Sequence, residues 1–327
     1  MNRSFSELNR YGLKRILMRA NLQQHRKMSD IRFRLYTLGA GIAGEQKVLD
    51  YLKNLRFGFP FRVLWDIRLE VSSRQYVQID LLVLTPTRAI IYEVKNIGGR
   101  LRFEDNPARL DKVDADGFIS DSFECPVLQL EEEMAGLRQW LEMNRISSTV
   151  DGAVVMTANP VFEQAKKDGR VFRLREIRRH LATERTGPSG RSGPQIEELA
   201  KLFMRAHEPY FPFPLRNQFN IQENELYWGP ICSDCGELVI RKSERTWICR
   251  ACGTRCKNVF EETLLDWFLL KGRLISSEDI RHLFSLADRR SASWIIRRFE
   301  LDRIQDSRLV LYSWDYSALR LPYRLNE

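Results

Sequence analysis

The sequence predicts an α/β protein with three kinds of module: an α/β sandwich, a small metal-binding module and a helical module. A helical period is followed by alternating strands in residues 38–157. Two Cys-x-x-Cys pairs lie in residues 232–252, and amphipathic segments run through residues 261–300. The length of 327 residues agrees with this, because at about 100–200 residues per domain it predicts two or three domains.

The composition is that of a folded protein without a membrane span. Hydrophobic residues make up 43% of the chain and the mean hydropathy is −0.38, so the chain has enough apolar side chains to bury cores. No apolar run approaches the roughly 18 residues that a membrane span needs, and no apolar leader stands at the N-terminus. Six cysteines are too few for a disulfide scaffold of this length. We therefore expect a cytoplasmic protein with no membrane partner.

Basic residues are concentrated at the N-terminus. The net charge is +9, and residues 1–36 hold nine Lys or Arg against two acids. This segment predicts one or two basic helices, with Leu13, Ile16 and Leu17 as a thin apolar stripe. A basic flank favours a polyanion such as nucleic acid, because neutralised phosphates release their counterions. The alternative is that these charges are simply solvated.

Residues 37–160 contain the pattern of the α/β sandwich. Leu38–Leu55 has a helical period that ends at Gly58–Pro60. Thr85–Arg88 is turn-like, with proline at a favoured position, and separates two β-rich runs. The predicted strands are Phe61–Val71, Tyr76–Leu84, Ala89–Asn96 and Gly152–Thr157, and a second helix is predicted over Pro126–Met143.

The turn predicts a register in which two acids face each other. A two- or four-residue loop pairs Leu82 with Ile91 and therefore Asp80 with Glu93. Directly opposed residues point to the same face of a hairpin, and the period of two puts Lys95 on that face as well. Two opposed carboxylates repel each other unless a positive charge lies between them.

Glu45 adds a third acid, because it lies on or beside the apolar stripe of the first sandwich helix, where a carboxylate needs a partner. One alternative for any of these acids is a structural ion pair with a lysine. Three acids and a lysine that converge from separate elements favour a divalent-metal site, because Mg²⁺ binds carboxylate oxygens together with substrate phosphate.

These residues resemble the core of the PD-(D/E)xK nuclease superfamily, and in particular its NERD (nuclease-related) domain. The resemblance covers about residues 37–160. It is based on Gly41-Ile42-Ala43-Gly44-Glu45, on Ile79-Asp80 leading to Tyr92-Glu93-Val94-Lys95-Asn96 with glycine soon after, and on Pro126-Val127-Leu128-Gln129 at the start of an amphipathic helix. The implied fold is a restriction-endonuclease-like α/β core.

The resemblance also implies catalytic roles. Asp80, Glu93 and the Val94 carbonyl would hold Mg²⁺ or Mn²⁺, and Glu45 would complete the metal shell. Lys95 would orient or help to activate the attacking water and stabilise the charge that develops on phosphate. Gln129 would position substrate or a ligand. The insertion-like stretch between Gly99 and Pro126, which is rich in Asp, is interpreted as a solvated hairpin that turns near Asp114–Gly117.

The cysteine module, residues 228–257, predicts a structural zinc site. Its two Cys-x-x-Cys-Gly pairs are separated by thirteen residues, a spacing typical of a closed tetrahedral Zn²⁺ site. The module resembles the zinc ribbon at topoisomerase C-termini. Cys256 is interpreted as spare and Cys125 as a lone buried thiol. The four ligands are Cys232, Cys235, Cys249 and Cys252, and the side chains expected to contact nucleic acid are Arg241, Lys242, Arg245, Trp247 and Arg250. Protein docking is the alternative role of such a ribbon.

Residues 258–327 predict a helix-turn-helix or winged-helix-like module. Glu262–Lys271 is an amphipathic helix closed by Gly272, and Ser276 begins a capping box for a second helix. A third helix runs through Trp294–Phe299. Leu309–Ser313 and Ala318–Leu321 would form a wing. Arg289, Arg290, Arg297 and Arg298 would then contact phosphates; the alternative is a helical trio that packs on the rest of the protein.

The sequence thus predicts five segments and one main function. The segments are residues 1–36, 37–160, a helical connector and linker over 161–227 with a Gly-, Pro- and Ser-rich stretch at 184–194, 228–257 and 258–327. The predicted function is a Mg²⁺- or Mn²⁺-dependent nuclease (a hydrolase of DNA phosphodiester bonds), with RNA, homo-oligomers and a repair or defence complex as open partners. The alternatives are a catalytically silent nucleic-acid-binding or adaptor protein and a protein-docking component.

Overall fold

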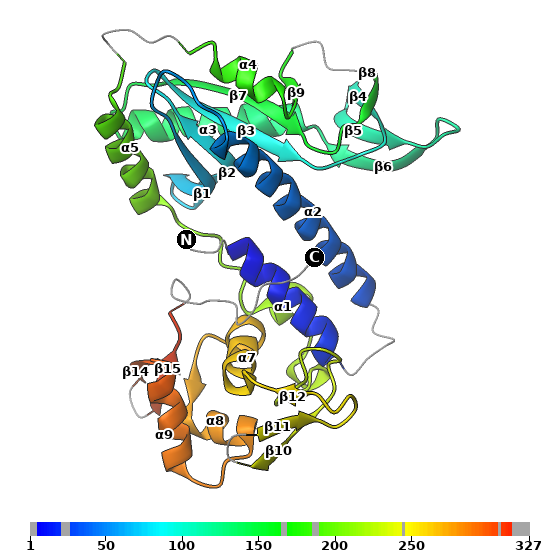
Figure 1. Cartoon of the computed structure of the whole chain (residues 1–327), viewed down its shortest axis with the longest axis vertical. Helices are drawn as coiled ribbons and strands as arrows, with labels where there is room; N and C mark the ends of the chain where they lie inside the picture. Colours follow the sequence, from blue (N-terminus) through cyan, green and yellow to red (C-terminus); the bar gives the residue numbers. More distant parts are fainter. Residues whose placement is uncertain are drawn as a thin grey trace. The chain divides into compact units, whose positions relative to one another are not determined.

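The computed structural model divides the chain into two compact units. One comprises residues 40–210, and the other, here called the terminal unit, combines residues 1–39 with residues 211–327 (Figure 1). Helix α2 (Met28–Lys53) contributes residues to both. The structure describes residues 5–20, 27–164, 169–184, 190–243, 246–306 and 309–315. Residues 185–189 of the expected linker, Arg245 and Ala318–Leu321 of the expected wing lie outside these ranges.

A five-stranded sheet forms the centre of the 40–210 unit and confirms the predicted α/β class. Its strand order is β1-β2-β3-β7-β9 (Figure 1). The first three strands are antiparallel, whereas β7 and β9 run parallel to β3 and to each other. The bounds are β1 Arg62–Ser72, β2 Gln75–Leu84, β3 Arg88–Lys95, β7 Thr149–Met156 and β9 Val171–Arg173.

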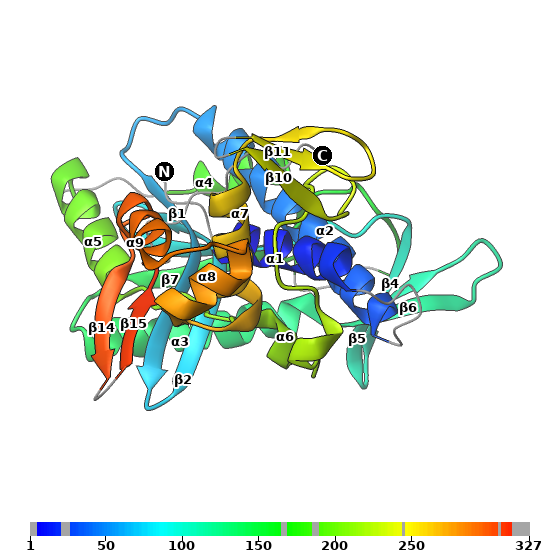
Figure 2. The ribbon, with the colours of Figure 1, turned by 90° about the horizontal axis from the view of Figure 1, so that it is seen from below.

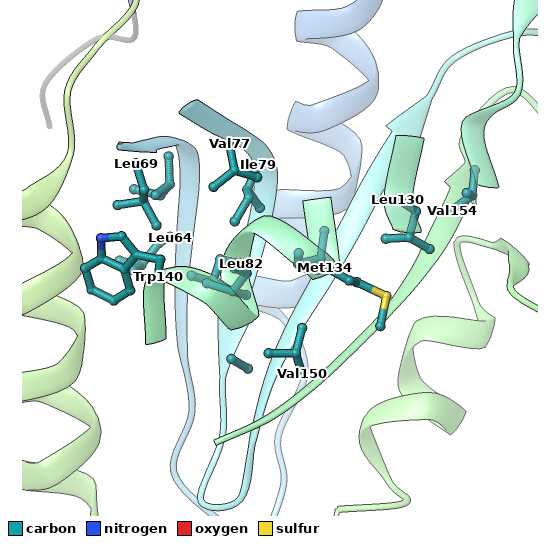
Figure 3. Close-up of a cluster of buried hydrophobic side chains, with 14 of the residues drawn as sticks. Leu64, Leu69, Val77, Ile79, Leu82, Leu130, Met134, Trp140, Val150 and Val154 are labelled. Carbon is teal, nitrogen blue, oxygen red and sulfur yellow. The ribbon is translucent and has the colours of Figure 1, made fainter. Parts of the chain in front are cut away.

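Apolar clusters on the two faces of this sheet hold it between helices. On one face, Leu130, Met134 and Trp140 of α3 lie over β2 and β7 (Figure 3), and Trp140 stacks on Phe203 of α5 with ring centroids 4.5 Å apart. On the other face, the second half of α2 packs with α4 against β2, β3 and β7. The helices are α3 (Pro126–Met143), α5 (Gly193–Ala206) and α4 (Glu176–Leu181).

Glycines allow α3 to approach the sheet closely. A Cβ atom at Gly152 of β7 would lie 2.8 Å from Leu130 Cδ1 and 2.9 Å from the Ile91 carbonyl oxygen. A Cβ atom at Gly136 of α3 would lie 2.9 Å from Val77 Cβ on β2. These contacts leave no room for a larger residue, so they hold α3 directly against the strands that carry the predicted acids.

A second sheet corrects the expectation of a solvated hairpin after Gly99. Its order is β6-β5-β4-β8, and Leu101, Phe103 and Leu110 are buried in the same cluster that α3 covers. The expected turn is present, with the Asp114 N–H donating to the Phe118 carbonyl at 2.9 Å. The alternating apolar residues therefore form part of the core rather than a free hairpin. The strands are β4 Arg100–Asp105, β5 Ala108–Val113, β6 Ile119–Glu124 and β8 Val161–Gln164.

Two arginines of α1 (Phe5–Arg19) are buried inside the terminal unit. Arg15 Nε donates to Asp266 Oδ1 at 2.8 Å, and Arg19 Nε donates to Asp266 Oδ2 at 2.7 Å. Arg19 Nη1 also donates to the Tyr227 and Gly229 carbonyls. These two charges of the basic N-terminal segment therefore bind within the protein and are not available to a polyanion. The short helices nearby are α6 (Leu215–Gln218) and the 3₁₀ turn η1 (Glu223–Glu225).

The C-terminal part of the terminal unit combines three helices with a three-stranded sheet of order β13-β15-β14 (Figure 2). The Ser276 capping box is present, because the Asp279 N–H donates to Ser276 Oγ at 3.0 Å and the Ser276 N–H donates back to Asp279 Oδ2 at 2.9 Å. The strand that pairs with β15 is β14, which the sequence did not predict. The elements are α7 Val259–Asp266, its π-helical extension η2 Trp267–Lys271, β13 Ile275–Ser276, α8 Ser277–Phe284, α9 Arg289–Arg298, β14 Asp302–Asp306 and β15 Leu309–Ser313.

Within the described residues, no helix has the length and apolar character needed to cross a membrane.

Candidate functional site

The β2–β3 hairpin has the register that the turn predicts. Leu82 pairs with Ile91, and the last pair of the ladder is Leu81 with Tyr92. Continued by one step, the same register would pair Asp80 with Glu93. The backbone ladder stops before this position, and the Val94 N–H donates instead to Asp80 Oδ2 at 2.9 Å. The Asp80 carboxylate therefore takes the place of a main-chain acceptor at the end of the hairpin.

The sheet also opens on the other side of Asp80. The β1–β2 ladder passes over the pair Asp66–Asp80, and Asp66 has a left-handed backbone with φ of 52°. Ile79 and Leu82, which strict alternation would place on opposite faces, both belong to the cluster under α3. The alternation of β2 thus slips at Asp80. The sheet is therefore irregular at Asp80, and side chains from both of its faces can approach this position.

Lys95 lies between Glu93 and Gln129. Its Nζ is 2.5 Å from Glu93 Oε1 and donates to Gln129 Oε1 at 2.8 Å. Burial lowers the pKa of Lys95, but the ion pair and hydrogen bond with Glu93 outweigh it, so the net pKa is raised. The lysine therefore stays protonated at neutral pH. Three of the residues singled out in the sequence are in direct contact here.

Glu133 belongs to the same cluster, although the sequence interpretation missed it. Gln129 Nε2 donates to Glu133 Oε1 at 3.1 Å. Burial, followed by the charges of Glu93 and Asp80, raises the pKa of Glu133 to about 10. The spacing of four residues from Gln129 on one helix was the signal that could have identified it, because residues i and i+4 share a face.

Glu45 reaches the cluster from α2. A Cβ atom at the preceding Gly44 would lie 2.9 Å from Asn96 Cβ, 3.2 Å from Thr157 Oγ1 and 3.3 Å from Val94 Cγ1, so this turn of α2 lies directly against the end of β3. Burial and the nearby charges of Asp66 and Glu93 raise the pKa of Glu45 to about 7. The absence of a side chain at Gly44 therefore lets α2 lie close to the sheet and brings Glu45 to its edge.

The cluster holds four acids and one lysine, so its acids outnumber their cationic partners. Burial and the charges of Glu93 and Glu45 raise the pKa of Asp80 well above its ordinary value, despite the hydrogen bond from Val94. The charges of Asp80, Glu93 and Glu133 act on Lys95, and the charge of Glu45 acts on Asp80, so four carboxyl groups share one lysine. Without a cation, the raised pKa values mean that bound protons compensate part of the negative charge. Carboxylate oxygens with an unmet need for positive charge fit a hard divalent cation that keeps water and phosphate among its ligands. The residues present therefore fit Mg²⁺ or Mn²⁺.

The four predicted zinc ligands meet in the terminal unit. Their sulfur atoms all lie within 4.8 Å of one another, and three of the Sγ–Sγ distances are 3.4, 3.7 and 3.8 Å. A zinc ion bound by four sulfurs at about 2.3 Å would place neighbouring sulfurs about 3.8 Å apart. Gly236 and Gly253, which follow the two pairs, have φ of 79° and 72°, a conformation that favours glycine. The cluster fits a zinc ribbon, with strands β10 Val239–Ser243, β11 Thr246–Cys249 and β12 Arg255–Cys256.

Among the residues that the structure describes, these thiols are the one group of three or more metal-binding side chains as close as 4.8 Å. Glu45, Asp80 and Glu93 do not approach one another to that extent. Cys256 lies outside the four-thiol group, and Cys125 is a buried free cysteine at the start of α3.

The expected nucleic-acid-contacting residues differ in exposure. Arg241, Lys242 and Arg250 of the ribbon are exposed. Trp247 is only 6% exposed and its ring packs edge-on against Phe260 at 5.7 Å. This corrects the expectation that Trp247 stacks on bases, because a buried ring has no free face.

Helix α9 presents all four of its predicted arginines, Arg289, Arg290, Arg297 and Arg298, to solvent. Trp294 of the same helix is 47% exposed, and the Arg298 guanidinium lies 5.6 Å from its ring centroid. The sequence interpretation did not assign Trp294 to the interface. Trp294 is an exposed aromatic side chain on α9, so a nucleic-acid base could contact it.

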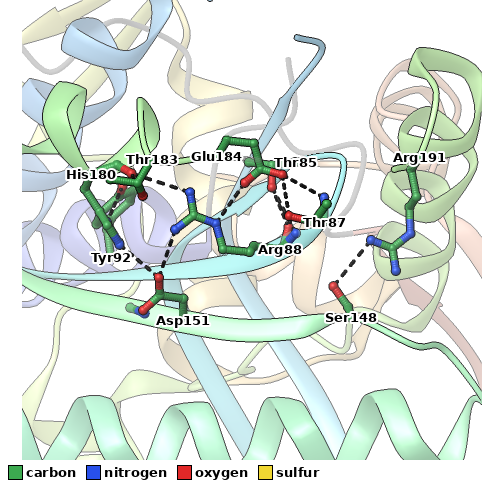
Figure 4. A network of polar contacts seen from close by, with 11 residues as sticks. Thr85, Thr87, Arg88, Tyr92, Ser148, Asp151, His180, Thr183, Glu184 and Arg191 are labelled. Carbon is green, nitrogen blue, oxygen red and sulfur yellow. Dashed lines mark hydrogen bonds and ion pairs between the residues drawn. The ribbon is translucent and has the colours of Figure 1, made fainter. Parts of the chain in front are cut away.

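A different polar network holds the turn end of the β2–β3 hairpin (Figure 4). Arg88 Nε donates to Glu184 Oε2 at 2.8 Å, and Arg88 Nη1 donates to Asp151 Oδ2 at 3.0 Å. His180 Nε2 lies 3.0 Å from the same Asp151 oxygen, and its Nδ1 lies 3.1 Å from the Tyr92 hydroxyl. The sequence interpretation did not predict this network.

Comparison with known families agrees with the resemblance seen in the sequence. Residues 40–157 match the family model of the nuclease-related domain, NERD. This range contains every acid of the cluster together with Lys95 and Gln129, and it indicates a nuclease-related function. No curated protein and no solved structure matches the chain.

Proposed function

Because residues 40–157 form a nuclease-related domain, we propose that this protein is a metal-dependent nuclease that hydrolyses phosphodiester bonds of DNA. The observation that carries the proposal is that Asp80, held by the Val94 N–H, and the Glu93–Lys95 ion pair lie together at the open end of the β2–β3 hairpin. Structural acids normally acquire donors, whereas these remain in excess over their one lysine. In this reading the 40–210 unit is a PD-(D/E)xK-type core.

Asp80, Glu93 and the Val94 carbonyl would hold Mg²⁺ or Mn²⁺, and Glu45 would add a carboxylate from α2. The cation would supply charge on the non-bridging phosphate oxygens and lower the pKa of a bound water. Asp80 is held in place by the Val94 N–H, which fixes one carboxylate oxygen and leaves the other for the metal. The slipped alternation at Asp80 brings Glu45 of α2 and Glu93 of β3 close enough for their charges to act on Asp80.

Lys95 would act as a cation and hydrogen-bond donor, because its pKa is raised. Its ammonium group would orient the attacking water and stabilise the charge that develops on phosphate in the transition state. Gln129 would position Lys95, since its carbonyl oxygen accepts from Nζ while its amide donates to Glu133. A positioning role for Gln129 is more specific than the substrate contact expected from the sequence.

The terminal unit would grip nucleic acid. Zinc would hold the ribbon together, and a closed four-thiol site leaves no position for catalysis. The helix-turn-helix-like part would present α9, where Trp294 lies among exposed arginines. Replacing Arg297 or Arg298 by alanine should weaken DNA binding similarly for all sequences and lower the slope of log affinity against log salt by about one each. An unchanged slope in both would remove α9 from the interface.

A cleavage assay on the zinc-loaded full chain tests the proposal. Plasmid, linear and single-stranded DNA are incubated with Mg²⁺, with Mn²⁺ and with neither ion. We expect cleavage only with a divalent cation and none with Lys95→Ala. Binding of DNA without cleavage under every condition would favour the rival function, a catalytically silent nucleic-acid-binding protein. Equal cleavage by wild type and Lys95→Ala would exclude this site as the source of activity.

A further inference from the structure

Strand β9 and helix α4 bring positive charge to an otherwise acidic part of the chain. Residues 40–157, the range that matches the nuclease-related domain, hold 14 Lys or Arg against 18 Asp or Glu. Residues 169–181 follow this range and hold five Arg against one Glu. They include β9 and α4, which belong to the same 40–210 unit. Because a polyanion binds where its phosphates meet positive charge, this segment is a candidate surface for nucleic acid.

The register of the sheet places Arg173 in line with Lys95. Lys95 pairs with Met156 on β7, and Met156 pairs with Arg173 on β9. Lys95 contacts Gln129 of α3, and Met156 is buried in the apolar cluster under the same helix. Phe172, next to Arg173, packs on the opposite face with α2 and α4. Since paired residues of parallel strands point to one face and successive residues alternate, the Arg173 side chain leaves the sheet on the same face as Lys95.

The spacing of this row suits a nucleic-acid strand. Lys95 and Arg173 are two strand spacings apart, which is about 10 Å between their Cα atoms. In duplex DNA a phosphate of one strand follows about every 3.4 Å along the axis, so this distance spans about three phosphates. The Arg173 side chain is exposed, and its N–H donates to Glu176 Oε2 at 2.8 Å. A strand whose cleaved phosphate lies at Lys95 would therefore bring another of its phosphates within reach of Arg173.

Two further basic side chains lie at the carboxyl ends of the same strands, beside α2. Lys47 Nζ of α2 is 3.5 Å from Oδ1 of Asn96, the residue directly after Lys95. Arg175 follows β9, and its carbonyl accepts from the Tyr51 hydroxyl of α2 at 3.4 Å. Both basic side chains are exposed. In α/β sheets, ligands bind outside the carboxyl ends of parallel strands, so Lys47 and Arg175 stand where a ligand of this sheet would pass.

We propose that Arg173, with Lys47 and Arg175 beside it, binds backbone phosphates of the DNA strand that is cleaved. The inference rests on the proposed nuclease function, which places the cleaved phosphate at Lys95. The contact is with the backbone, so it carries no sequence preference. Arg173 is its main residue, because a guanidinium can donate two parallel hydrogen bonds to one phosphate. The surface belongs to the chain beyond the nuclease-related match, since β9 follows residue 157.

The salt dependence of DNA binding tests the proposal without measuring cleavage. The zinc-loaded full chain is titrated into labelled linear duplex DNA without added divalent cation, and anisotropy gives the affinity at several salt concentrations. Arg173→Ala should lower the slope of log affinity against log salt by about 0.9, and replacement of Lys47 and Arg175 as well should lower it by about 2.7 in total. From about 50 to about 200 mM salt, wild-type affinity should then fall about 3.5-fold more than that of Arg173→Ala.

Matched variants separate a phosphate contact from a general loss of charge. Arg173→Lys keeps the charge and should keep the wild-type slope. Arg56→Ala, at an exposed arginine between α2 and β1, should keep it too. Any contribution of the terminal unit is common to all these chains. With Mg²⁺, Arg173→Ala should raise KM and leave kcat within about twofold of wild type, because it removes binding that is equal in the ground and transition states.

Each outcome decides something. A wild-type slope in Arg173→Ala, an equal loss in Arg56→Ala, or no DNA binding by wild type overturns the proposal; cleavage by wild type would still support the nuclease. A lowered slope in a chain that never cleaves keeps the surface and overturns the nuclease. A triple variant no different from Arg173→Ala removes Lys47 and Arg175 from the surface. If thermal melting shows that Arg173→Ala is unfolded, Arg173→Gln, which keeps the aliphatic stem, takes its place.

Discussion

Carboxylates lie at both ends of the β2–β3 hairpin, and their surroundings shift their pKa values in opposite directions. At the turn end, burial disfavours the charge of Glu184, but hydrogen bonds from Thr87 and Arg88 outweigh it and lower its pKa. The pKa of Asp151 is held well below its usual range by its contacts with His180 and Arg88. At the open end, the pKa of Asp80 is raised because burial and neighbouring acids outweigh a single donor.

We interpret the acids of the turn end as structural and propose that those of the open end are functional. The turn end is complete, with a donor for each carboxylate (Figure 4). The open end is incomplete, because its four carboxyl groups share one lysine. Under the proposed function, a divalent cation would complete it. Substituting one acid at each end tests whether the two ends differ in this way.

The largest expected effect is on cleavage. Asp80→Asn should lower the rate of DNA cleavage by about 10³-fold, because removal of one preorganised electrostatic group typically costs that order. Asp151→Asn, on β7 beside the turn end of the hairpin, should change the rate by less than about twofold. Both cleavage rates are measured with Mg²⁺ on plasmid DNA. Similar losses in both variants would mean that the two ends do not differ in function.

The next effect is on stability at the turn end. Glu184→Gln should lower the free energy of unfolding of the 40–210 unit by roughly 3 kcal/mol, since it removes the charge from a buried ion pair and leaves Arg88 with one partner fewer. Denaturant titration combined with hydrogen exchange of β3 measures it. A variant as stable as wild type would show that the turn end is no better satisfied than the open end.

Much of this contrast could be predicted from the sequence, because it depends on local patterns. The turn Thr85–Arg88 sets the register that brings Asp80 opposite Glu93, and the ladder has that register up to Leu81–Tyr92. The spacing of the four cysteines predicted their cluster for the same reason, since short Cys-x-x-Cys turns determine their own geometry. The Ser276 capping box is another short-range signal.

What could not be predicted depends on tertiary packing. Glu133 stands in a run of three glutamates, and only the fold shows which one faces the sheet. Arg15 and Arg19 resemble solvated charges in the sequence, yet they bury against Asp266, which lies about 250 residues away in the chain. Of Trp247 and Trp294, the fold buries the first and exposes the second. Whether each of these side chains is buried or exposed depends on tertiary contacts that the local sequence does not show.

At the open end, a substitution should have the opposite effect on stability to Glu184→Gln. Without added Mg²⁺, Asp80→Asn should raise the free energy of unfolding of the 40–210 unit by about 1–2 kcal/mol, because it removes a buried like charge while the amide oxygen still accepts from the Val94 N–H. Saturating Mg²⁺ should shrink the difference, since only wild type gains full metal binding. Hydrogen exchange of β2 and β3 is the measurement. A less stable variant would mean that the Asp80 charge already has enough partners.

The smallest effect is the pH dependence of this stability. A carboxyl group whose pKa is higher in the folded state binds its proton more tightly there, so the free energy of unfolding falls as pH rises from the unfolded pKa to the folded one. For Glu45 this window runs from about 4.5 to about 7. Without Mg²⁺, hydrogen-exchange protection of β3 should therefore decrease across it, with a slope below about 1.4 kcal/mol per pH unit for this group.

Glu45→Gln should flatten that slope, and saturating Mg²⁺ should do the same in wild type because a bound cation favours the ionised acids. Asp151 gives the opposite sign: its pKa is lowered, so its contribution to stability is lost only as pH falls below the ordinary range of an aspartate. Across the window of Glu45, Asp151 therefore contributes no slope. If protection instead rises with pH between about 4.5 and 7, the carboxylates of the open end are satisfied without a metal, and the contrast between the two ends disappears.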